Sequence, residues 1–131
     1  MNRVVIAILV GIGILVGVGA LTARSDKPAK HDSQAFAMIQ ADVARGAKFY
    51  DVRTSAEYAS GHFASTTNFP LQELQAGKLP EISKNTKIYV HCHTGNRSAQ
   101  AAAILRQSGF TNVDDLGGIA SVQSLGGVLV K

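Results

Sequence analysis

The 131-residue chain has a single cysteine, Cys92, and no tryptophan. One cysteine excludes an intramolecular disulfide, so a noncovalent core must stabilise the fold. The net charge of +4 is mild, and the basic side chains are scattered rather than clustered with aromatic ones. Nucleic-acid-binding domains concentrate positive charge on one face, so we expect no nucleic acid as a partner. Small aliphatic residues predominate over the 6% of aromatic residues, which suits an α/β domain with closely packed helices.

The amino-terminal part of the chain is set apart by its hydropathy. Arg3 precedes an unbroken apolar run from Val4 to Leu21, and a polar stretch follows. This pattern predicts a signal peptide or membrane anchor at residues 1–23 and a linker at residues 24–32. Basic residues flank the run on both sides, so the charge distribution favours neither membrane orientation. We expect a bacterial cell-envelope protein that is periplasmic or, if the segment is retained, anchored in the inner membrane.

The remaining residues, 33–131, alternate between helical and extended patterns. Thr54 and Glu57 form a capping box at the start of one of the helices. Helices are predicted at 34–45, 55–60, 71–76 and 97–108, with a short one after Gly118; strands are predicted at 47–52, 66–69, 87–91 and 112–116. Such alternation predicts a single α/β domain with a central parallel sheet flanked by helices on both sides.

Cys92 follows the apolar strand 87–91, and Arg97 begins a helix five positions later. In open α/β sheets ligands bind beyond the carboxyl ends of the strands, so this cysteine is placed where chemistry is expected. Between the two residues, Gly95 and Asn96 tolerate left-handed backbone angles. We therefore expect the loop to curl so that several successive N–H groups point at the cysteine sulfur.

Inward N–H groups would favour the thiolate form of Cys92. Hydrogen bonds to a charged group contribute about 1.5–3 kcal/mol each, whereas a helix dipole contributes about 0.3–1 kcal/mol. We therefore expect the amides to dominate and to stabilise both a nucleophilic thiolate and a persulfide. This covalent route needs no cofactor.

His91 and His93 flank the cysteine, but adjacent strand residues point to opposite faces, so no metal site is expected. Arg97 suits either a simple helix-terminal charge or contact with an anion.

Several motifs resemble the rhodanese family of sulfurtransferases over residues 33–125. They are Asp51-Val52-Arg53 with Glu57-Tyr58 and Gly61-His62, Asn68-Phe69-Pro70-Leu71, Cys92 to Ser98, and Gly109 to Val113 with Leu116-Gly117-Gly118. Together with the amino-terminal segment, they are similar to the small, single-domain periplasmic members of that family.

The resemblance implies an enzyme that moves a sulfane sulfur from thiosulfate through a Cys92 persulfide to cyanide or a thiol. Substrate binding is expected from the loop residues His93, Thr94, Gly95, Asn96 and Arg97, and support of the loop from Asp51 and Arg53. The second domain of larger rhodaneses and the tryptophan often found after Gly118 are both missing. We therefore expect an open, shallow pocket and weak affinity for the substrate.

Two other functions remain open from the sequence. The same cysteine could serve a non-enzymatic persulfide carrier or sensor. A cysteine phosphatase or arsenate reductase would also use a cysteine-to-arginine loop. The loops of those families have one more residue between the two, whereas four residues separate Cys92 and Arg97 here. The shorter loop favours a site for one sulfur over a site for a tetrahedral phosphate.

Overall fold

The structure is a computed structural model, and it describes residues 33–131. The elements in chain order are α1 (Ser33–Ala44), β1 (Lys48–Asp51), α2 (Ser55–Ser60), β2 (His62–Phe63), β3 (Thr67–Asn68), α3 (Leu71–Gln75), β4 (Ile88–His91), α4 (Asn96–Gln107), β5 (Val113–Asp115), α5 (Ile119–Ser124) and β6 (Leu129–Val130). The predicted amino-terminal segment and linker lie outside the described residues. Within residues 33–131, no helix is both long and apolar enough to cross a membrane.

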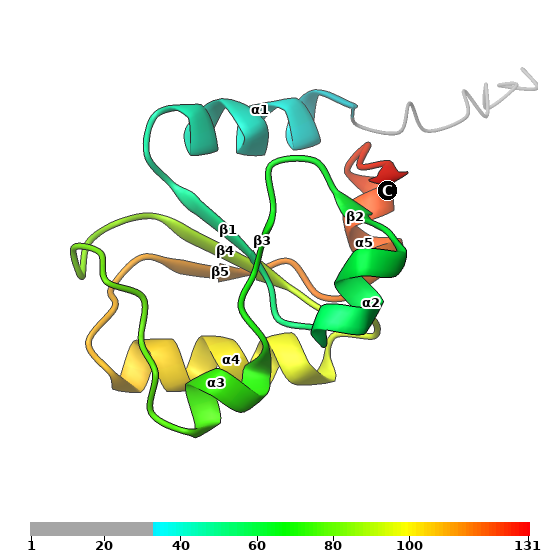
Figure 1. The fold of residues 1–131 in the computed structure, drawn as a ribbon. Helices are drawn as coiled ribbons and strands as arrows, with labels where there is room; N and C mark the ends of the chain where they lie inside the picture. Colours follow the sequence, from blue (N-terminus) through cyan, green and yellow to red (C-terminus); the bar gives the residue numbers. More distant parts are fainter. Residues whose placement is uncertain (1–32) are drawn as a thin grey trace, which may run out of the picture.

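A four-stranded parallel sheet forms the centre of the domain, in the order β3-β1-β4-β5. Helices cover both of its faces, with α1 on one side and α3 and α4 on the other (Figure 1). Parallel neighbours require crossover connections, and here helices supply most of them. The predicted α/β class and the central parallel sheet flanked on both sides are thus confirmed.

The strand β4 explains why the chain reads as an apolar run before the cysteine. Ile88 and Val90 pack into the core beneath α3 and α4, whereas Tyr89 packs into a second core beneath α1 and α5. A strand covered on both faces buries every side chain, so it loses the alternation of a half-exposed strand. Cys92 lies just beyond this strand and packs into the core on the α4 side.

The predicted capping box at α2 is present. The Glu57 amide donates to Thr54 Oγ1 at 3.3 Å, and Glu57 Oε2 accepts from the Thr54 amide at 3.0 Å. The helix ends before Gly61, as expected. A second, two-stranded antiparallel sheet of β2 and β6 was not predicted. Each of its strands is two residues long, which is too short for hydrophobic periodicity to reveal.

Candidate active site

Cys92 lies between the end of β4 and the start of α4, at the carboxyl end of the parallel sheet. The next strand, β1, ends beside it, because Asp51 is paired in register with His91. Gly95 precedes α4 with a φ of 100°, in the left-handed region that glycine adopts without strain. The structure therefore confirms the predicted position of the cysteine and the predicted curl of the loop.

One loop amide reaches the sulfur. The Gly95 N–H donates to Cys92 Sγ over 3.0 Å, and among residues 33–131 it is the one amide that does so. We expected several amides to converge on the sulfur, and the structure shows one. The N–H of Cys92 itself is turned away from the sulfur, because it donates to the Gly117 carbonyl at 3.0 Å. A single backbone donor thus supplies the hydrogen bond that would favour negative charge on the sulfur.

An open, shallow pocket was expected, and in the structure the cysteine itself is buried. Cys92 has no exposed surface. The segment after β5 packs directly on the loop: the Ile119 N–H donates to the His93 carbonyl at 2.9 Å. A Cβ atom on Gly118 would lie only 2.4 Å from the same carbonyl oxygen. The segment after β5 and the cysteine loop therefore pack backbone against backbone.

A hollow of about 650 Å³ does exist, but it lies away from Cys92. Its lining includes Asp42, Arg45, Lys87 and Tyr89. The Tyr89 hydroxyl donates to Asp42 at 2.6 Å, and Arg45 pairs with the same carboxylate. Because these groups satisfy one another, we do not regard the hollow as the reactive site.

Arg97 is bound by Glu57 of α2. Its two terminal nitrogens lie 2.7 and 2.9 Å from the two carboxylate oxygens. The Arg97 guanidinium, which hydrogen-bonds Glu57, holds the pKa of that carboxyl well below its usual range. We expected Arg97 to serve either as a helix-terminal charge or as a contact for an anion. Neither expectation included this ion pair, which connects α2 with the first turn of α4. Glu57 was expected only as a capping residue, and its pairing with Arg97, 40 positions along the chain, was missed.

Asp51 and Arg53 form a buried ion pair beneath the loop. The Arg53 guanidinium donates to the Asp51 carboxylate over 2.7–3.0 Å, and its Nη2 also donates to the Gly61 carbonyl at 2.7 Å. Burial would raise the pKa of Asp51, but the nearby His91 ring and the Arg53 guanidinium lower it and prevail. Asp51 reaches the cysteine loop through His91, whose Nε2 lies 3.5 Å from Oδ2, whereas Arg53 joins β1 to the end of α2. His91 was not predicted as part of this group.

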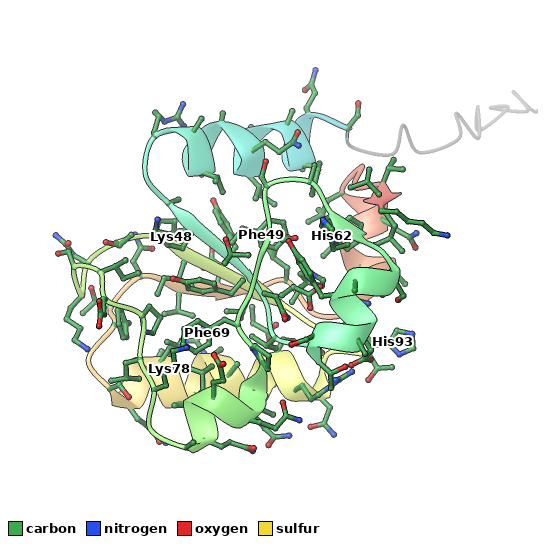
Figure 2. The ribbon with its side chains drawn as sticks, in the orientation of Figure 1. Lys48, Phe49, His62, Phe69, Lys78 and His93 are labelled. Atoms are coloured by element: carbon green, nitrogen blue, oxygen red, sulfur yellow. The ribbon has the colours of Figure 1, made fainter. Side chains whose placement is uncertain are left out.

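The other predicted loop residues lie at the rim of the site. The His93, Thr94 and Asn96 side chains are exposed, and Figure 2 shows His93 at the outer edge of the domain beside α2. Asn96 Oδ1 accepts a hydrogen bond from Gln100 on the outer surface of α4. His93 therefore points outward while His91 is fully buried, and in the described part of the chain no three potential ligands gather to hold a metal ion.

Comparison with known proteins places this geometry in a family. The rhodanese-like domain family matches residues 34–124. The thiosulfate sulfurtransferase PspE of Escherichia coli is 35% identical over 75 residues, which cover 55% of this chain and 70% of PspE. Among solved structures, a rhodanese with anions from Escherichia coli superposes with a TM-score of 0.54 at 31% identity, covering 66% of this chain and 99% of that one. A rhodanese-related protein from Thermoplasma volcanium gives a TM-score of 0.58 at 34% identity, covering 72% and 93%. With its cysteine loop at the end of β4, the chain belongs to the rhodanese-like family of sulfurtransferases.

Proposed function

We propose that the domain is a thiosulfate sulfurtransferase that carries a sulfane sulfur on Cys92. The observation that carries this proposal is the hydrogen bond from the Gly95 N–H to Cys92 Sγ at the carboxyl end of the sheet. A donor fixed at the sulfur favours the thiolate, which is the nucleophilic form of cysteine. The 35% identity to PspE, a thiosulfate sulfurtransferase, supports the choice of donor.

The proposed reaction has two substitutions at sulfur. In the first, the Cys92 thiolate attacks the outer sulfur of thiosulfate, the S–S bond of thiosulfate breaks, and sulfite leaves with the bonding electron pair. In the second, cyanide or a thiolate attacks the outer sulfur of the Cys92 persulfide, and the Cys92 thiolate leaves. The Gly95 N–H stabilises the anionic sulfur at both ends of the cycle, and neither substitution requires a metal or an organic cofactor.

Access to Cys92 requires movement of the loop, because the sulfur is fully buried. We propose that the side chains of His93, Thr94 and Asn96 move aside to admit thiosulfate, while the Gly95 N–H keeps its place at the sulfur. The exposed His93, Thr94 and Asn96 side chains and the loop amides then contact its sulfonate oxygens. The Arg97 guanidinium stays with Glu57 and adds positive charge near the site without leaving its partner.

The same ion pair disfavours a phosphatase or arsenate reductase. Such an enzyme needs the guanidinium that ends its loop to bind the substrate oxyanion. In this structure both terminal nitrogens of Arg97 are held by the Glu57 carboxylate.

A persulfide carrier would use the same cysteine as the enzyme. Repeated turnover with a small acceptor separates the two, because a carrier loads once and then stops.

The experiment that tests the function is incubation with thiosulfate followed by intact mass analysis. The wild-type chain is expected to gain the mass of one sulfur atom, and Cys92→Ser is expected to gain none. Addition of cyanide should then remove the sulfur and give steady production of thiocyanate. A wild-type mass that stays unchanged, or sulfur that also adds to Cys92→Ser, would refute the proposal.

We further propose that residues 1–23 direct the domain to the cell envelope, as either a signal peptide or an anchor. The support is the apolar run from Val4 to Leu21 behind a positive start. Fractionation of cells that express the full chain should place it in the periplasmic or the membrane fraction. Recovery of the uncleaved chain in the cytoplasmic fraction would contradict this assignment.

A further inference from the structure

His91 is the residue before the proposed nucleophile, and its imidazole is completely buried. The ring lies between the aromatic rings of Phe49 and Phe63, with centroid distances of 5.4 and 5.2 Å. Its Nε2 is the one buried side-chain nitrogen or oxygen among residues 33–131 that lacks a hydrogen-bond partner. Burying a ring nitrogen without a hydrogen bond costs stability. Its position therefore calls for an explanation.

The peptide groups around Cys92 are held almost entirely by other main-chain groups. The His91 carbonyl accepts from the Val52 N–H at 3.0 Å, and the Cys92 N–H donates to the Gly117 carbonyl at 3.0 Å. The His93 carbonyl accepts from the Ile119 N–H. The Cys92 carbonyl differs, because its partner is a side chain: His91 Nδ1 lies 3.1 Å away. A carbonyl oxygen can only accept, so Nδ1 carries a hydrogen and donates.

The other side of the ring faces a fixed carboxylate. Nε2 lies 3.5 Å from Asp51 Oδ2, and the Arg53 guanidinium and amide hold that carboxylate in place. The ring is thus confined between aromatic side chains, an anchored acid and the Cys92 carbonyl. Asp51 at the end of β1 and Arg53, two residues later, are the charged groups that this part of the core places beside the ring.

We propose that His91 is a positioning residue for sulfur transfer, holding the Cys92 carbonyl so that the loop leaves β4 in the direction that brings the Gly95 N–H to the sulfur. The Cys92 carbonyl belongs to the peptide plane from which residues 93–96 depart. If that plane rotates, the Gly95 N–H moves away from Sγ. The inference deepens the proposed function, since it rests on Cys92 as the sulfur carrier.

Three substitutions of His91 test the proposal. In His91→Asn the side-chain amide can occupy the place of Nδ1 and still donate to the Cys92 carbonyl, although it cannot reach Asp51. In His91→Gln the amide extends toward Asp51 and loses the short reach to the carbonyl, and His91→Leu has no donor. Ile39→Ala serves as the control, because Ile39 is buried in the same core beneath α1 but does not adjoin the loop.

The readouts are the rate of Cys92 alkylation by iodoacetamide across a pH series and the rate of sulfur loading from thiosulfate. Loss of one hydrogen bond to the loop should lower both rates about tenfold in His91→Leu. His91→Asn should recover most of the loss and His91→Gln little of it. Ile39→Ala should keep both rates even though it melts at a lower temperature. This pattern would support positioning rather than general stabilisation.

Wild-type rates in a folded His91→Leu would overturn the proposal, as would equal rates in the Asn and Gln variants. The Asn and Gln comparison also decides the matter if the Leu variant does not fold. An Ile39→Ala variant as slow as His91→Leu would likewise refute a specific role. Failure of the wild type to load sulfur would instead refute the proposed function, while the alkylation rates would still test the positioning of the thiol.

Discussion

Replacing Gly118 with alanine would place a methyl group against the loop that holds Cys92. Gly118 has a φ of −89°, an angle that alanine adopts readily, so the backbone itself is not strained. The new Cβ would lie 2.4 Å from the His93 oxygen and 3.0 Å from Thr94 Cα. To regain an ordinary contact of 3.4 Å, the carbonyl must retreat by about 1 Å. That movement also stretches its hydrogen bond with the Ile119 N–H.

The expected loss of stability is about 1–3 kcal/mol, which is typical of an overpacked core. In a domain of this size each kcal/mol lowers the melting temperature by about 4–8 °C. The rate of sulfur transfer should fall more steeply than the stability, because a 1 Å displacement of a reactive group can cost about 100-fold in rate. Urea unfolding measures the first effect, and thiocyanate formation at a temperature where both proteins are folded measures the second.

Gly127→Ala is a matched control. Gly127 is also outside the left-handed region, and a Cβ there would lie 3.0 Å from side-chain atoms of Phe63 and Val122, in the core on the α1 side. This variant should lose stability but keep its rate per folded molecule. Retention of the wild-type rate and stability in Gly118→Ala would refute the reasoning, as would equal losses of activity in the two variants. In either case the close approach of Gly118 to the loop does not control the rate of sulfur transfer.

Other substitutions test the surroundings of the site. Glu57→Gln should cost less than about 1 kcal/mol at pH 7, because the ion pair with Arg97 is partly exposed. Since the folded pKa of Glu57 is depressed, its contribution is complete above the usual value of 4.5 and fades as the pH falls. The stabilities of wild type and variant in urea should therefore draw steadily closer as the pH falls below 4.5, and a constant difference would contradict this. Thr54→Ala should lose about 1 kcal/mol by thermal unfolding, whereas Thr54→Ser should lose less; equal losses would discount the cap. Leu105→Ala, at a side chain that is 1% exposed, should lower stability by about 2–5 kcal/mol in urea, and a smaller loss would indicate that α4 repacks.

The sequence predicts the parts of the fold that depend on local patterns. Ile88 to Val90 are apolar because β4 is covered on both faces, so the run is visible without knowledge of its neighbours. The capping box of Thr54 and Glu57 spans four residues, and its chemistry can be read from residue types alone. The position of Cys92 follows from the end of that run and the start of the next helix.

Contacts that depend on the register between strands could not be predicted in this way. His91 meets Asp51 because the two residues pair across β4 and β1, which lie 40 positions apart in the sequence. The ion pair of Glu57 and Arg97 spans the same separation and requires α2 to lie over the start of α4. The close approach of Gly118 to His93 and Thr94 is likewise set by tertiary packing that no local pattern encodes.

The complete burial of Cys92 has a consequence for the resistance of the protein to oxidation. Thiolates that are exposed to solvent react with peroxides and advance irreversibly to sulfinic and sulfonic acids. On the mechanism proposed above, a sulfur without exposed surface meets such oxidants only when the loop residues move aside. Bulky disulfides such as oxidised glutathione are excluded even more strongly than peroxide. The closed loop should therefore act as a shield that slows oxidative inactivation of the resting protein.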